Sequence, residues 1–187
     1  MSSFRSFISI PAPSSLQASA STVIQNLQSI SSSVKWEKPE KLHITLKFLG
    51  LVDESLLKKI TGGITSEVRN VESFVVEYSG LGAFPTLENP RTLWIGASGG
   101  EDLLQLSSLV ESVCSSFGIP SEGRTFHAHV TIGRVKSSHN QNRLTASAKS
   151  VTLEAIAARC SELYIMKSEL HPTGSQYTVV QSIPLKS

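Results

Sequence analysis

Two short segments of this chain carry nearly the same residues in the same order. Residues 42–46 read Leu-His-Ile-Thr-Leu, and residues 128–132 read Ala-His-Val-Thr-Ile. Side chains two residues apart in an extended strand point to the same face. Each segment therefore predicts a strand with an imidazole beside a hydroxyl on one face. Because 86 residues separate His43 from His129, the spacing indicates two similar lobes that each contribute one strand to a shared cleft.

The rest of the chain predicts alternating strands and helices. Helices are expected, from apolar periodicity and capping residues, at 14–32, 54–69 and 101–117, and a weaker one at 140–149. Strands are expected at 4–10, 41–49, 73–78, 92–97, 126–135, 163–166 and 177–183. Ser14 and Asp53 are the expected N-caps of the first two helices, and the Gly- and Pro-rich residues 80–90 are an expected loop at the cleft edge.

Several connections are too short for parallel crossovers, so antiparallel sheets are favoured. We therefore predict an α+β fold with two pseudo-symmetric lobes. Each lobe has an antiparallel sheet and flanking helices around a central cleft, within a single domain over residues 1–187.

Composition and charge narrow the class of partner. The net charge of +2 and the 40% hydrophobic content predict a folded globule. A duplex-binding face normally carries a denser Lys/Arg stripe, so a small anionic ligand or the end of a nucleic-acid strand fits the charge better. Cys114 and Cys160 have no metal or disulfide spacing, and Pro11 and Pro13 interrupt the first apolar run. We expect a cytoplasmic monomer with no membrane partner.

The paired segments supply the groups that phosphodiester cleavage needs. Histidine has an ordinary pKa of about 6.5, so one copy can be neutral while the other is protonated. A neutral imidazole takes a proton from water, an imidazolium gives one to the departing sugar oxygen, and each such step contributes about 10²–10⁴-fold. Threonine hydroxyls donate to phosphate oxygens, at about 1.5–3 kcal/mol each. The predicted catalytic residues are His43, Thr45, His129 and Thr131, and no metal or other cofactor is expected.

Three alternatives stay open at this point. His127 and His129 share a strand face and form a possible zinc pair, with His139 or His171 as a third ligand. Residues 96–100 read Gly-Ala-Ser-Gly-Gly between a strand and a helix, which matches a nucleophile elbow and predicts a serine hydrolase that uses Ser98. A non-catalytic nucleotide-binding module of the same fold would keep the cleft and lack turnover.

Longer matches identify a family resemblance. Residues 42–50, Leu-His-Ile-Thr-Leu-Lys-Phe-Leu-Gly, and residues 126–134, Phe-His-Ala-His-Val-Thr-Ile-Gly-Arg, resemble the two signatures of the two-histidine (2H) phosphoesterases. Within that superfamily they resemble the RNA 2′,3′-cyclic phosphodiesterases, also called the 2′-5′ RNA ligase family. Weaker similarities extend over most of the chain, at Arg5–Ile8, Trp94, Ser168, Gly174 and Tyr177. One departure is Ala128, where the family often has proline.

The resemblance implies a bilobal fold with a pseudo-twofold axis and metal-independent hydrolysis of 2′,3′-cyclic phosphates. On this basis we assign His43 as general acid and His129 as general base, and the pseudo-symmetry leaves the reverse assignment open.

Four further residues are substrate-binding candidates. Arg134 is expected to contact the phosphate. Lys47, two residues beyond Thr45, is expected on the same strand face. Phe84 is expected to stack on the base from its loop, and Tyr177 to reach the cleft. Phe7, Phe48 and Trp94 are further possible stacking groups, although core packing is favoured for Phe48 and Trp94.

Overall fold

The fold is known from a computed structural model, which describes residues 3–31, 33–137, 141–172 and 174–187. The described elements follow in the order β1 (Ser3–Pro11), α1 (Ser14–Gln28), β2 (Val34–Trp36), η1 (Pro39–Lys41), β3 (His43–Asp53), α2 (Glu54–Val68), β4 (Phe74–Pro85), β5 (Pro90–Ser98), α3 (Gly100–Ser116), β6 (His129–Val135), α4 (Gln141–Ser150), β7 (Ile156–Cys160), β8 (Glu162–His171) and β9 (Gly174–Pro184).

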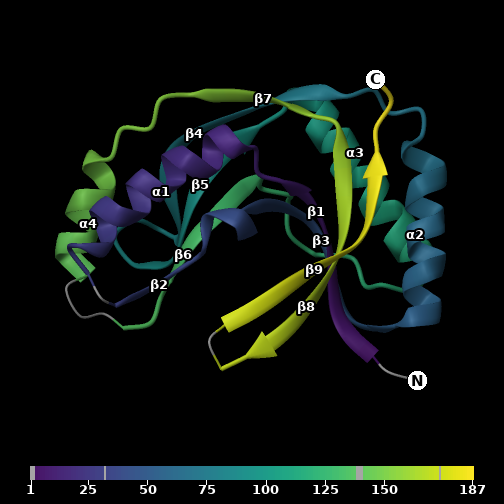
Figure 1. The fold of residues 1–187 in the computed structure, drawn as a ribbon, viewed down its shortest axis with the longest axis horizontal. Coiled ribbons are helices and arrows are strands. Elements are labelled where there is room, and N and C mark those ends of the chain that lie inside the picture. The colour runs from purple at the N-terminus through teal and green to yellow at the C-terminus, as the bar shows by residue number, and fades with distance from the viewer. Residues whose placement is uncertain (1–2, 32, 138–140, 173) are drawn as a thin grey trace.

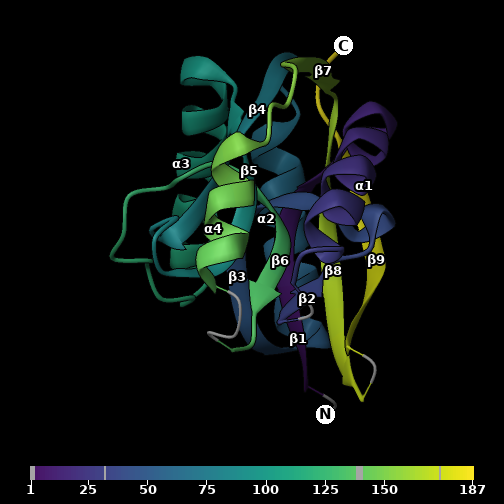
Figure 2. The same ribbon diagram turned by 90° about the vertical axis from the view of Figure 1, so that its left-hand side faces the viewer.

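The strands form one curved sheet in the order β7-β4-β5-β6-β3-β1-β8-β9, and β2 also pairs with β6. The strands pair antiparallel. Helices α1 and α4 accompany the β4-β5-β6 half, and α2 and α3 accompany the other half (Figure 1). In Figure 2, α1 and α4 face the viewer. The α+β class and the antiparallel pairing are confirmed. The predicted separation into two lobes with one sheet each is not confirmed, because both halves of the molecule share a single sheet.

The helices bury regular apolar stripes against the sheet, as their periodicity predicts. Asp53 caps α2, since its side chain accepts a hydrogen bond from the Leu56 amide at 2.8 Å. The expected cap at Ser14 is wrong, because Pro13 occupies the N-cap of α1 without a side-chain hydrogen bond. A Cβ at Gly63 would lie 2.9 Å from Val113 and from Phe117, so this glycine lets α2 pack closely against the C-terminal end of α3. No described helix is long and apolar enough to cross a membrane.

A β-bulge follows the threonine in each of the two similar strands. In β3, Thr45 pairs with Ser9 and Lys47 with Ile8, so one residue between them is unpaired. In β6, Thr131 pairs with Trp94 and Gly133 with Leu93, so one residue between Thr131 and Gly133 is again unpaired. A bulge interrupts the alternation of side chains. The residue three positions beyond each threonine therefore returns to the face of the motif.

The bulge in β3 makes the expectation for Lys47 wrong. Its side chain turns to the helix-covered face and is only 1% exposed. The ammonium donates to Glu111 of α3 at 2.9 Å and to the Pro120 carbonyl at 2.7 Å. Glu111 also accepts from the Ser121 hydroxyl at 2.7 Å. Lys47 therefore anchors the loop that leads from α3 to the second histidine motif, and its charge is not available to a substrate.

Removal of either partner of this pair is expected to destabilise the fold, by unequal amounts. Breaking a buried ion pair costs about 3–5 kcal/mol when one charge is left buried and unpaired. Glu111→Gln leaves the buried Lys47 ammonium without its carboxylate, whereas Lys47→Met leaves a carboxylate whose side chain is 30% exposed. Urea denaturation should give the larger loss for Glu111→Gln, at about 3 kcal/mol.

Lys58→Met is the matched control, because its pair with Glu54 is exposed on both sides. It should change the free energy of unfolding by less than about 1 kcal/mol. Equal losses for Glu111→Gln and Lys58→Met would contradict the anchoring role.

Candidate active site

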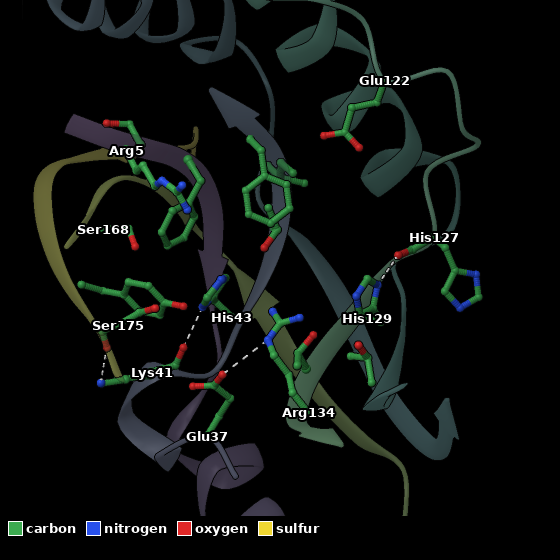
Figure 3. A pocket seen from close by; sticks show the side chains of 18 of the residues that line it. Arg5, Glu37, Lys41, His43, Glu122, His127, His129, Arg134, Ser168 and Ser175 are labelled. Carbon is green, nitrogen blue, oxygen red and sulfur yellow. Dashed lines mark hydrogen bonds and ion pairs between the residues drawn. The ribbon is translucent and has the colours of Figure 1, made fainter. Parts of the chain in front are cut away.

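The two motif strands meet at one residue pair, Ile44 of β3 and Val130 of β6. Directly opposed residues of an antiparallel pair point to the same face, and both of these side chains are buried in the core. The flanking residues of each motif therefore point to the other face. His43, Thr45, His129 and Thr131 accordingly line one pocket, and Figure 3 labels the two histidines. The structure brings all four predicted catalytic residues together.

Both imidazoles are held by the same backbone contact. The Nδ1 atom of His43 lies 2.6 Å from the Lys41 carbonyl, and that of His129 lies 2.6 Å from the His127 carbonyl. A carbonyl oxygen only accepts, so each Nδ1 carries the hydrogen. The neutral rings are therefore in the tautomer with a free Nε2 lone pair. That nitrogen accepts a proton when the ring is neutral and donates one when the ring is charged.

The environment lowers the pKa of both histidines below 6.5. Burial is the largest cause in each case, because it disfavours the charged ring. The Arg134 guanidinium lowers both values further, and a charge on His129 lowers that of His43. The bonds to the backbone carbonyls act in the opposite direction. The two rings therefore interact with each other and with one shared cation.

Arg134 reaches the pocket because of the bulge in β6. Strict alternation from Thr131 would bring residue 133 to this face, but the extra residue brings Arg134 there instead. Its guanidinium lies 3.9 Å from the Glu37 carboxylate and its side chain is 57% exposed. Figure 3 shows it between the two histidines as viewed into the pocket. Arg134 therefore lines the same pocket as the two histidines, and its contact with a phosphate stays a prediction.

Aromatic rings surround His43 on the β1 side. Phe7 stacks on it with ring centroids 4.9 Å apart, and the Tyr177 ring meets both rings edge-on at 5.1 and 5.6 Å. Tyr177 therefore reaches the pocket as expected.

Phe48 is 59% exposed and lines the pocket. Its expected core position is wrong, because the bulge turns it to the open face.

A second aromatic group surrounds His129. The centroid of the Phe84 ring lies 5.0 Å from that of the His129 ring and 5.2 Å from that of the Trp94 ring. The expected loop around Phe84 is wrong, because β4 continues to Pro85 and pairs with β5. Gly82 faces Trp94 in this pairing, and the missing side chain there makes room for the indole. Phe84 still lines the pocket.

Sequence reasoning missed two residues that organise the site. Lys41 accepts from His43 through its carbonyl and donates through its ammonium to the Ser175 carbonyl of β9 at 2.6 Å. Glu37 faces Arg134 from the segment after β2. Neither residue belongs to a periodic or repeated pattern. The only available signal was position, since Lys41 and His127 both lie two residues before a motif histidine.

The structure also locates the residues of the two alternative chemistries, a zinc site at His127 and His129 and a serine hydrolase at Ser98. The rings of His127 and His129 lie 6.0 Å apart, and the described residues contain no group of three or more His, Cys, Asp or Glu side chains that could hold a metal ion. His139 lies outside the described residues, and His171 is exposed at the end of β8. Ser98 is exposed at the end of β5 and is not among the described residues that line the pocket.

Comparison with known proteins gives consistent matches over most of the chain. A family model described as the 2′-5′ RNA ligase superfamily matches residues 13–172. The chain is 31% identical to a Methanothermobacter thermautotrophicus protein named RNA 2′,3′-cyclic phosphodiesterase, over 93% of this chain and 95% of that one. It is 36% identical to an Archaeoglobus fulgidus protein of the same name, over 71% and 73% of the two chains.

Solved structures share the fold. A protein from Thermus thermophilus superimposes with a TM-score of 0.82 at 22% identity, over 98% of both chains. Escherichia coli LigT, crystallised with 3′-AMP, superimposes with a TM-score of 0.78 at 20% identity, over 100% of both chains. At these identities the likeness concerns the arrangement of the backbone.

Loss of the Arg134 charge should raise the pKa of both pocket histidines. The guanidinium lowers both values, so Arg134→Gln is expected to move both titrations upward, as followed by the ring-proton resonances in NMR. Arg91→Gln is the control, because Arg91 is exposed on β5 and is not among the pocket-lining residues. A rise confined to one histidine, or an equal rise in the control, would contradict a common site.

Proposed function

Because the chain belongs to the 2′-5′ RNA ligase superfamily, we propose that it is an enzyme that hydrolyses 2′,3′-cyclic phosphates at RNA ends or on small nucleotides to phosphomonoesters. The names of its curated relatives support a cyclic phosphodiesterase. The observation that carries the proposal is the matched pair of imidazoles, each held through Nδ1 and each turned to one pocket through Nε2.

The pocket contains groups for each part of the reaction. Water attacks phosphorus as its proton passes to the neutral Nε2 of one histidine. The bond from phosphorus to one ribose oxygen breaks, and that oxygen takes a proton from the charged Nε2 of the other histidine. Thr45 and Thr131 donate hydrogen bonds to the non-bridging oxygens, and Arg134 offsets the charge that gathers there. Proton exchange with solvent restores both rings.

The two walls of the pocket differ at equivalent positions. Phe48 of β3 pairs with Phe7 of β1, whereas Arg134 of β6 pairs with Thr92 of β5. Both pairs lie beyond a motif bulge and line the pocket. On the first wall Phe7 is buried behind His43, and the exposed ring of Phe48 suits a nucleobase by stacking. The second wall suits an anionic phosphate oxygen through Arg134.

This asymmetry favours one assignment of roles. With the base on the Phe7–Phe48 wall, the ribose and its departing oxygen lie nearer to His43. His43 then acts as general acid, and His129 acts as general base toward water that enters from the Arg134 side. No metal ion is needed in this scheme, since the two imidazoles perform both proton transfers and Arg134 supplies the positive charge.

His43→Ala and His129→Ala are each expected to lower turnover of 2′,3′-cyclic AMP by about 10²–10⁴-fold, because each removes one proton-transfer step. The assay contains EDTA, and the wild type should retain full activity there. His171→Ala, outside the pocket and exposed, should match the wild type. Nucleotide binding without product in the wild type would instead indicate a binding module, and activity restored only by added zinc would indicate a metal enzyme.

The pH profile should reflect the lowered histidine pKa values. The free enzyme needs one protonated ring, and both rings have a pKa below 6.5, so kcat/KM should already fall as the pH rises through values below 6.5. A bound phosphate anion favours protonation, so the optimum of kcat should lie at higher pH. The apparent pKa values from the two limbs of the pH profile belong to the histidine pair and not to either residue alone. A kcat/KM profile that stays maximal above about pH 7.5, a full unit beyond the ordinary histidine pKa, would contradict this account.

A further inference from the structure

The wall formed by β1 continues beyond the aromatic rings to a further cation, Arg5. Arg5 lies two residues before Phe7, so both side chains leave β1 on the pocket face. The Cα atoms of such residues are about 7 Å apart along a strand. Arg5 and Phe7 both line the pocket (Figure 3 labels Arg5).

Ser168 completes a polar group at this position. It pairs directly with Arg5 across the β1–β8 ladder, so the two side chains share a face. Its hydroxyl also lines the pocket, on the same side as Arg5 in Figure 3. An arginine and a serine at one place present several hydrogen-bond donors to an anion.

The Arg5 guanidinium is available for a ligand. Within the described part of the chain, no hydrogen bond or ion pair engages it, and its side chain is exposed. Arg134 differs, because it faces Glu37 at 3.9 Å. The proposed reaction uses Arg134 and leaves the charge of Arg5 without a role.

We propose that Arg5 and Ser168 form a subsite for the phosphate on the 5′ side of the terminal nucleotide. The proposal rests on the function proposed above. With the cyclic phosphate between the histidines and the base on the exposed Phe48, the 5′ oxygen of the ribose points away from the reacting phosphorus. The strand then leaves along β1, and its next phosphate lies beside Arg5. The subsite makes an RNA end a better substrate than a free cyclic mononucleotide.

The test compares three substrates: adenosine 2′,3′-cyclic phosphate, the same nucleotide with a 5′-phosphate, and a diadenylate with a terminal 2′,3′-cyclic phosphate. For the wild type, the two substrates that carry a 5′ phosphoryl group should have a kcat/KM about tenfold above that of the first, as expected for one charge-assisted contact. Arg5→Gln should remove this advantage and leave kcat/KM for the first substrate unchanged. Arg91→Gln, which removes an equal charge outside the pocket, should retain it.

The outcomes separate the two proposals. If the wild type hydrolyses none of the three substrates, the proposed function is wrong. If it hydrolyses them and Arg5→Gln lowers all three equally, or leaves the advantage of the 5′ phosphoryl group intact, the subsite is wrong. If only the diadenylate is preferred and Arg5→Gln does not affect that preference, recognition is of the second nucleoside, and the subsite is again wrong.

Discussion

The contact between Ile44 and Val130 is the constraint on which the site depends. Within the described part of the chain these two buried residues form the only ladder pair between β3 and β6, and they join the two halves of the sheet. Since opposed residues share a face, the core position of both side chains directs the neighbouring histidines and threonines to the opposite side. Burial of two aliphatic side chains thereby gathers four polar groups, from segments far apart in sequence, into one pocket.

Beyond this junction, a matched irregularity shapes each half of the pocket. A bulge after each threonine reverses the side-chain pattern, so Phe48 and Arg134 face the substrate space. The same bulge turns Lys47 to the far face, where it holds the loop after α3 through Glu111. The two halves thus share a backbone design and differ in chemistry, with an exposed aromatic ring on one side and a guanidinium on the other, and the proposed roles of the two walls rest on this difference.

Much of this arrangement follows from local patterns in the sequence. The strand alternation at the two motifs correctly placed His43 and His129 with their threonines, because strict alternation holds from the histidine to the threonine. It failed at Lys47, two residues beyond Thr45, because of the bulge, and the positions of Lys47 and Phe48 were wrong for that reason. Phe84 was predicted on a loop but lies on a strand, because the glycine- and proline-rich segment around it pairs with β5. The contacts of Lys41 and His127 are made by their backbone carbonyls, so the identity of these residues gives no signal and only their position before each motif histidine does.

In the proposed mechanism both imidazoles act on a single phosphorus centre. The most direct measurement is an NMR titration of the wild-type protein with inorganic phosphate at fixed pH, following the ring-proton resonances of His43 and His129. The account predicts that both resonances shift toward the protonated position along one binding curve with a single Kd, because one anion lies between two rings of lowered pKa. A response of one histidine alone, or two separable dissociation constants, would contradict it.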